Sequence, residues 1–276
     1  MMTPFSSREE SLALIQDAQN MPTLPDRFLK IRDLIADPHS DSNDLNDIIG
    51  TDFSTSSTLL KIANSTAYNP HGRALSSLPH AIARLGMSTS AEIAMSMSLL
   101  ENLTSTKSIE RVHALWANAY AVAMIAKYMH QRLKAPLENN IPTVFMMGLL
   151  HDIGQLILAI RVDEDYFDHD FHALHGENLC HAETEMYGIN HAEAGAAILT
   201  CWNMPDVLIA STLNHHQTST NLVFNLCQLA ESFIYEHWPN IQHIEEVQQL
   251  LSYSPVDKID IALRASPVFQ KYMPNA

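Results

Sequence analysis

The sequence predicts an all-α protein, on the basis of its apolar spacing and its low glycine content. Apolar residues recur three and four positions apart along most of the chain, which is the period of amphipathic helices. Only 8 glycines occur among 276 residues, and 46% of the residues are hydrophobic, as expected for a helical globular protein with a sizeable core. No stretch in the first half is typical of a strand.

The overall charge argues against two classes of partner. The chain carries 16 Lys and Arg against 31 Asp and Glu, a net charge of −15. Nucleic acids and anionic membranes need a basic face, so we expect neither as a partner. The three cysteines are odd in number and share no metal-type spacing, which favours reduced thiols. With no basic start followed by an apolar run at the N-terminus, the sequence predicts a cytoplasmic protein.

The first half is expected to form about five short helices. A helix over residues 9–20 is broken by Pro22 and Pro25, and Asp41 or Ser42 is expected to cap a later one. The apolar positions that mark the first four helices are Leu12 and Ile15, then Phe28, Ile31 and Leu34, then Leu45 and Ile49, then Leu59 and Ile62.

Gly86 separates two further helical patterns and is expected to be a C-cap. The polar segment 104–108 is the expected boundary between an N-terminal helical subdomain, residues 1–106, and a second subdomain, residues 107–276. The second begins with a long helix over residues 112–133, rich in alanine. Small side chains of this kind allow neighbouring helices to approach closely.

The stretch from Val144 to Ile160 is an apolar helical pattern with two adjacent polar residues, His151 and Asp152, at its centre. A buried carboxylate is costly unless it is paired, hydrogen-bonded or bound to a metal. Glycines at positions 148 and 154 leave room beside the pair for another helix or a ligand. Because polar residues interrupt the apolar run, a buried core helix is favoured over a membrane span.

The remaining patterns predict four more helices and two further short ones. An acidic stretch, residues 163–177, contains three histidines that we interpret as a solvated surface. Helices are expected over residues 178–187, from His191 onward, and from Pro205 to the adjacent His215 and His216. A further helix carries Leu226, Leu229, Glu231 and Phe233, and two short helices are expected after about residue 248.

Several segments together resemble the HDOD (HD-related output domain) family of bacterial signalling proteins. LPDRF, LLKIANS and LPHAIARLG are similar to signature segments of its first half, in the same order. GLLHDIGQLIL, GINHAEAGAAILTCW and NHH are similar to its HD-type region. The resemblance covers roughly residues 21–238. It implies an HD-domain-like helical bundle related to metal-dependent HD phosphohydrolases, including the HD-GYP cyclic-dinucleotide phosphodiesterases.

The resemblance also implies a metal site. Related enzymes bind divalent metals through a helix histidine, the His-Asp pair, further histidines and a late aspartate. The matching candidate ligands in this chain are His151, Asp152, His191, His215, His216 and Glu231. Imidazole and carboxylate together suit iron, manganese, zinc or nickel, and magnesium is a further candidate. If the site is active, Asp152 is the expected catalytic residue.

Three positions depart from the family pattern. Asn118 stands where the first helix histidine is expected, and Asn is a weaker ligand for a transition metal. Glu231 stands where the late aspartate is expected and is one methylene longer. Gln155 replaces a lysine that could hold a phosphate. These departures indicate a degenerate centre. Alternatively, Asn118, His151, Asp152 and Glu231 form a hydrogen-bonded polar network without metal.

Two functions follow from this sequence. The first is a non-catalytic signal-transduction module that acts by binding a signalling protein or a small ligand, phosphorylated or not. The second is a metal-dependent phosphohydrolase that acts on a nucleotide or another phosphodiester. The first is favoured because the loss of the histidine at position 118 removes a group needed to position a second metal.

Overall fold

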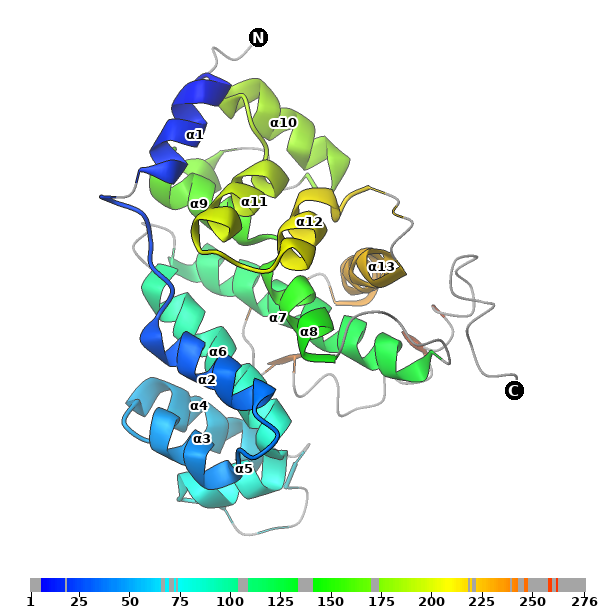
Figure 1. The fold of residues 1–276 in the computed structure, drawn as a ribbon. Coiled ribbons are helices and arrows are strands. Elements are labelled where there is room, and N and C mark those ends of the chain that lie inside the picture. The colour runs from blue at the N-terminus through cyan, green and yellow to red at the C-terminus, as the bar shows by residue number, and fades with distance from the viewer. Residues whose placement is uncertain are drawn as a thin grey trace. The chain divides into compact units, whose positions relative to one another are not determined.

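The computed structural model describes most of the chain and confirms the all-α fold. The described residues are 6–17, 19–65, 68, 69, 72, 74–103, 109–133, 141–169, 174–217, 219, 222–238, 240–242, 246, 247, 258, 259 and 262. They form thirteen α-helices and one 3-10 helix, with no strand within these ranges (Figure 1). The two short helices predicted after residue 248 fall largely outside the described residues.

The chain divides into two compact units. One contains the described residues of 1–22, 103–242 and 259–276, and the other those of 23–102 and 243–258. The N-terminal helix α1 (Arg8–Gln16) therefore packs within the unit that holds the second half of the chain. The division at residues 106 and 107 predicted from the sequence stays a prediction.

The smaller unit contains α2 (Asp26–Ala36), α3 (Ser42–Ile49), α4 (Phe53–Asn64), α5 (Leu78–Leu85) and α6 (Met87–Leu103). As predicted, Asp41 caps α3, and Gly86 ends α5 with a φ of 84°. That φ lies in a region that glycine adopts without a Cβ penalty. Asp52 caps α4 and also accepts a 2.6 Å hydrogen bond from Arg27 of α2.

The larger unit contains α1, α7 (Ile109–Arg132), α8 (Ile141–Leu150), α9 (Ile153–Arg161), η1 (Tyr166–Asp168), α10 (Glu177–Tyr187), α11 (His191–Cys201), α12 (Asp206–Asn214) and α13 (Leu222–His237). The long helix α7 packs along α8 and α13, while α11 packs against α9, α12 and α1. Fully buried aromatic rings, among them Trp116, Tyr120 and Phe145, fill the core near α7 and α8. This packing brings the ends of α8, α11 and α12 to one place.

The continuous helix predicted from Val144 to Ile160 is wrong. Helix α8 ends at Leu150 and α9 begins at Ile153, and the two axes differ by 42°. The His151 ring nitrogen Nδ1 lies 2.7 Å from the Gly148 carbonyl oxygen, in the last turn of α8. The ring thus bonds a carbonyl of the kind that helix ends leave without an intrahelical partner. The break lets both His151 and Asp152 point inward, with exposures of 1% and 4%.

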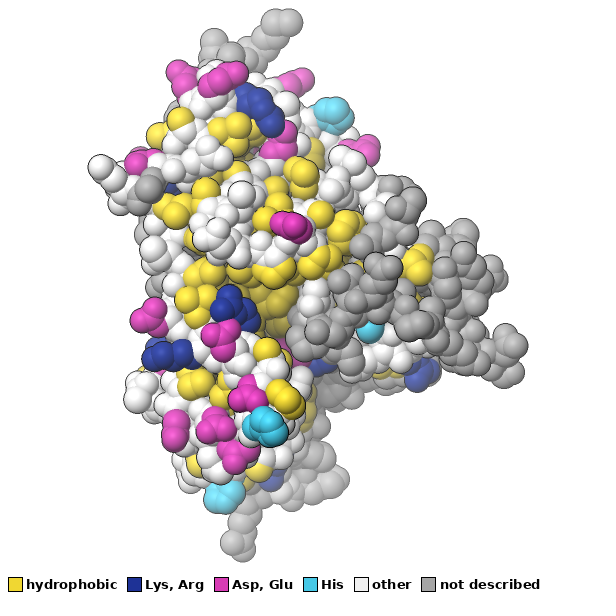
Figure 2. Space-filling view, in the orientation of Figure 1, with side chains coloured by type: hydrophobic (Ala, Val, Ile, Leu, Met, Phe, Trp, Pro, Cys, Tyr) yellow, Lys and Arg dark blue, Asp and Glu magenta, His cyan; other side chains and the backbone are white. Residues whose placement is uncertain are grey.

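The face of the molecule shown in Figure 2 has no large basic patch. Acidic side chains are scattered over the face shown in Figure 2, and Lys and Arg occur there singly or in small groups. Across the described ranges, no single helix combines the length and apolar character needed to cross a bilayer. Only α8 and α9 taken together, as a bent pair, have sufficient length and composition.

Candidate metal centre

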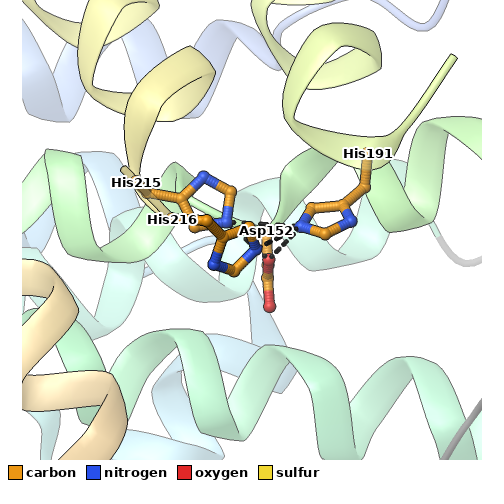
Figure 3. Close-up of side chains that lie close together, drawn as sticks. All are labelled: Asp152, His191, His215 and His216. Carbon is orange, nitrogen blue, oxygen red and sulfur yellow. Dashed lines mark hydrogen bonds and ion pairs between the residues drawn. The ribbon is translucent and has the colours of Figure 1, made fainter. Parts of the chain in front are cut away.

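Four side chains converge in the larger unit: Asp152, His191, His215 and His216 (Figure 3). Asp152 lies in the break between α8 and α9, and His191 is the first residue of α11. The two adjacent histidines follow the last turn of α12. Asn190 fixes the start of α11 through a capping box with Glu193. A local helix-capping signal therefore sets the position of His191.

The distances within this cluster suit a shared metal ion. The Nε2 atom of His191 lies 2.9 Å from Nε2 of His216 and 3.3 Å from Nε2 of His215. Asp152 Oδ1 lies 3.3 Å from Nε2 of both His191 and His215. Ligand atoms about 2.1 Å from one ion, at angles of roughly 90–109°, lie about 3.0–3.4 Å apart. The four side chains therefore fit a divalent transition metal without rearrangement of the helices.

Hydrogen bonds on the far side of two rings orient them toward the cluster. His191 Nδ1 lies 2.6 Å from Glu183 Oε2, and His215 Nδ1 lies 2.7 Å from the Thr212 carbonyl oxygen. Both partners are acceptors, so each Nδ1 must carry the proton. The Nε2 atoms are then directed at the cluster, in the arrangement that metal-binding histidines adopt once Nε2 is deprotonated.

Burial and charge set the protonation of these groups. Burial lowers the pKa of His215 and lowers that of His216 to about 3, so both rings are neutral. Burial also opposes a charge on His191, but the carboxylates of Glu183, Asp152 and Glu231 together raise the pKa of His191 to about 9. Burial opposes ionisation of Asp152 as well, yet the neighbouring imidazolium groups hold its pKa well below the usual range. The protein thus supplies one carboxylate and two rings ready to bind a cation.

A second group of candidate ligands shares Asp152. His151, Asp152 and Glu231 place one ligand atom each within 4.8 Å of one another, and all three are buried. Burial opposes a charge on His151, but Asp152 raises its pKa to about 9, and burial raises the pKa of Glu231 to about 7. All six ligands suggested by the family resemblance therefore lie together, in two groups that meet at Asp152.

Part of the alternative polar network is present among the described residues, in the contact between His151 and Asp152. Asn118 Oδ1, His151 Nε2 and Asp152 Oδ1 are buried, and none of them has a hydrogen-bond partner there. His151 Nε2 lies 3.4 Å from Asp152 Oδ2, and the two form an ion pair when the ring is protonated. Asn118 and Gln155 instead line a neighbouring cavity.

Glu183, which was not among the residues predicted from the sequence, holds the His191 ring on the side away from the cluster. This side chain is fully buried on α10. Besides the His191 ring, it accepts a 2.8 Å hydrogen bond from the His191 amide and a 2.5 Å hydrogen bond from the Tyr166 hydroxyl. Its position between Leu179 and Tyr187, one helical turn from each, places a carboxylate on the buried face of α10. This helical spacing is the sequence signal that could have shown that Glu183 is buried.

Replacing Glu183 with glutamine is expected to weaken metal binding about 10- to 100-fold, the usual effect of losing an outer partner of a ligating histidine. The neutral amide cannot strengthen the His191 ligand as a carboxylate does. Isothermal titration with Zn²⁺ on metal-stripped protein measures the change. The matched control is Glu185→Gln, an exposed position on the same helix. Equal affinities in the two variants would contradict the assigned role of Glu183.

Comparison with known proteins supports the fold and identifies its relatives. The profile of the HDOD domain matches residues 21–218. An HDOD domain protein of unknown function from Geobacter sulfurreducens is 22% identical, with a TM-score of 0.70 over 95% of this chain and 87% of that one. A structure from Shewanella amazonensis, provisionally described as a phosphohydrolase, is 21% identical, with a TM-score of 0.63 over 91% of each chain.

A curated relative from Treponema pallidum, itself uncharacterized, is 27% identical over 207 residues. The match covers 71% of this chain but only 38% of the relative. The chain therefore spans less than half the length of that protein.

Proposed function

The chain belongs to the HDOD family, and we propose that it is a non-catalytic regulatory module that holds one divalent transition metal ion. The ion is bound by Asp152, His191, His215 and His216 and stabilises the junction of α8, α9, α11 and α12. The module transmits its signal by contact with a partner protein, and neither a nucleic acid nor a membrane is its target. Free thiols at all three cysteines suit a reducing cytoplasm.

One observation carries this proposal: three imidazole nitrogens and a carboxylate oxygen converge at 2.9–3.3 Å, from segments far apart in the sequence. Three nitrogen ligands favour iron, manganese, nickel or zinc, whereas magnesium prefers oxygen ligands. Without a cation or protons, the lone pairs of these groups would repel one another in a site where three of the four side chains are buried. A metal ion satisfies all of them at once.

Two residues argue against catalysis. Asn118 supplies no imidazole to the second ligand group, which is left with His151, the shared Asp152 and Glu231. Gln155 supplies no positive charge for a phosphate. When bound, a metal ion supplies Lewis acidity toward a phosphoryl oxygen, but these residues offer little to hold that phosphoryl group in place.

The second candidate function is a metal-dependent phosphohydrolase. The observation in its favour is Glu231, a buried carboxyl group whose pKa is raised by burial to about 7. A carboxyl group with such a pKa can act as a general base near neutral pH. Glu231 shares a group of ligand atoms with His151 and Asp152, so a proton acceptor lies beside the proposed metal.

Elemental analysis of untagged protein, followed by a phosphodiesterase assay with bis(4-nitrophenyl) phosphate, tests the proposal. We expect about one iron, manganese, nickel or zinc ion per chain. The folded protein already positions the four ligands, so binding the ion requires no further folding. We expect no turnover above that of the free metal ion. Absence of metal after reconstitution would refute metal binding. Turnover that requires both the metal and Glu231 would establish the phosphohydrolase instead.

A further inference from the structure

Helix α1 packs on two of the helices that position the candidate metal ligands. Asp152 directly precedes α9, and His191 is the first residue of α11. Helix α1 contacts both α9 and α11 (Figure 1), and its Ile15 side chain is fully buried. The four candidate ligands all lie outside α1. The helix can therefore affect the metal centre only through the elements it supports.

The N-terminal half of α1 lies against the short connection that leads into His191. Ser11 is fully buried, and its hydroxyl donates a 2.7 Å hydrogen bond to the carbonyl oxygen of Tyr187, the last residue of α10. Gly188 follows with a φ of 70°, and a Cβ atom there would overlap the backbone nitrogen of Arg8. A glycine at this position permits both the backbone conformation and the close approach of α1. The contact thus orders the backbone just before His191.

An ion pair joins α1 to the start of α11 itself. Arg8 Nη1 lies 2.6 Å from Glu193 Oε1, and the other Glu193 carboxylate oxygen accepts a hydrogen bond from the Asn190 amide in the capping box. The Arg8 side chain is half exposed, so the pair by itself adds little stability. It matters because the same carboxylate contacts α1 and caps the helix on which His191 lies.

The C-terminal end of α1 is held by α9. Arg161, the last residue of α9, donates hydrogen bonds of 3.1 Å from Nε and 2.7 Å from Nη2 to the Leu14 carbonyl oxygen. This carbonyl is one of the last four of α1, for which a helix provides no internal donor. Helix α1 is therefore attached to α9 at one end and to the start of α11 at the other.

We propose that docking of α1 and binding of the metal ion are positively coupled, so that metal binding holds α1 in place and release of α1 weakens metal binding. Asp152 and His191 must lie close together to share an ion, and α1 fixes the helices that carry them. Binding to a site that is already ordered costs less conformational entropy, and such coupling acts equally in both directions. This inference rests on the function proposed above and adds the regulation of its metal centre.

Hydrogen–deuterium exchange of the full chain, first metal-stripped and then saturated with Zn²⁺, tests one direction of the coupling. Amides of α1 should exchange at least about fivefold more slowly with zinc, although α1 supplies none of the four ligands. Helix α3 of the smaller unit is the reference. Unchanged exchange of α1 in protein that binds zinc would refute the coupling alone. Failure of the wild-type protein to bind zinc would refute the metal centre and the coupling together.

Variants that loosen α1 test the opposite direction. Arg161→Met keeps the aliphatic part of the side chain but removes the donors to Leu14, and Ile15→Asp places a charge on the buried face of α1. Each variant should speed exchange in α1 and weaken Zn²⁺ binding in titration calorimetry at least about fivefold. The milder Arg161→Met provides the test should Ile15→Asp fail to fold.

Met129→Ala is the matched control for loss of overall stability. Met129 is buried on α7, a helix that supplies none of the four ligands. This variant should lower the Tm without changing the zinc affinity. An equal loss of affinity in Met129→Ala would show that affinity follows overall stability and would overturn the coupling. Wild-type zinc affinity in a folded variant with faster α1 exchange would overturn it as well, while leaving the metal centre intact.

Discussion

Replacing Asp152 with alanine is expected to abolish metal binding while leaving a folded helical protein. The carboxylate is the only oxygen ligand in the four-residue cluster, and its Oδ1 atom contacts the rings of both His191 and His215. Its Oδ2 atom contacts His151. Removing it leaves three imidazoles without the anion that balances a divalent charge in a buried site. Elemental analysis should find less than about a tenth of the wild-type metal, consistent with losing a direct ligand rather than an outer partner.

The matched control is Asp206→Ala, an exposed aspartate in the first turn of α12. It removes the same carboxylate from the helix that precedes His215 and His216, without touching the cluster. Its metal content should equal that of the wild type. Stoichiometric metal in the Asp152→Ala variant would place the ion elsewhere, for example on surface histidines, and would refute the proposed centre.

The sequence allowed most of the helices to be predicted because local signals define them. Asp41 as a cap and Gly86 as a C-cap are short-range features, and the structure confirms both. The break at His151 and Asp152 was not predictable in the same way. Helical apolar spacing continues on both sides of the two polar residues, so the pattern does not show that a helix ends there. The break depends on a side-chain hydrogen bond to the Gly148 carbonyl and on burial of both polar residues.

The candidate site likewise combines residues that local motifs identify with contacts that only the folded structure shows. The candidate ligands were found through motifs, since each lies in a recognisable segment of the family resemblance. Glu183 lies eight residues before His191 and belongs to another helix, so only the folded structure shows that it holds the His191 ring. Nor could spacing show that Asn118 and Gln155 share a cavity wall, because α8 separates α7 from α9 along the chain.

Gly154 explains how α9 and α11 come close enough to bring Asp152 and His191 together. The sequence left open whether the space beside this glycine is filled by a helix or a ligand, and the structure places α11 there. A Cβ atom at position 154 would overlap the carbonyl oxygen of His191 and would lie 2.6 Å from the amide nitrogen of Gly195. Both are backbone atoms of α11, which cannot move without shifting the whole helix.

Gly154→Ala is therefore expected to destabilise the protein by about 3 kcal/mol or more, at the upper end of overpacking effects. In a chain of this size, that corresponds to a fall in Tm of roughly 6–12 °C. The variant should also bind metal less tightly, because the displaced carbonyl belongs to His191 itself. Thermal unfolding followed by circular dichroism, together with metal analysis, measures both effects.

Gly195→Ala is the matched comparison on the facing helix. Its Cβ would lie 2.7 Å from the side-chain methyl carbon of Thr212, while its nearest backbone contact, the Gly154 nitrogen, is 3.2 Å away. Because most of that clash is with a side chain, Gly195→Ala should cost less, and adding Thr212→Ser should recover part of the loss. No second substitution of a side chain can rescue Gly154→Ala in this way. If Gly154→Ala unfolded at the wild-type temperature with full metal content, the close approach of α9 and α11 would be refuted, and with it the route by which Asp152 and His191 meet.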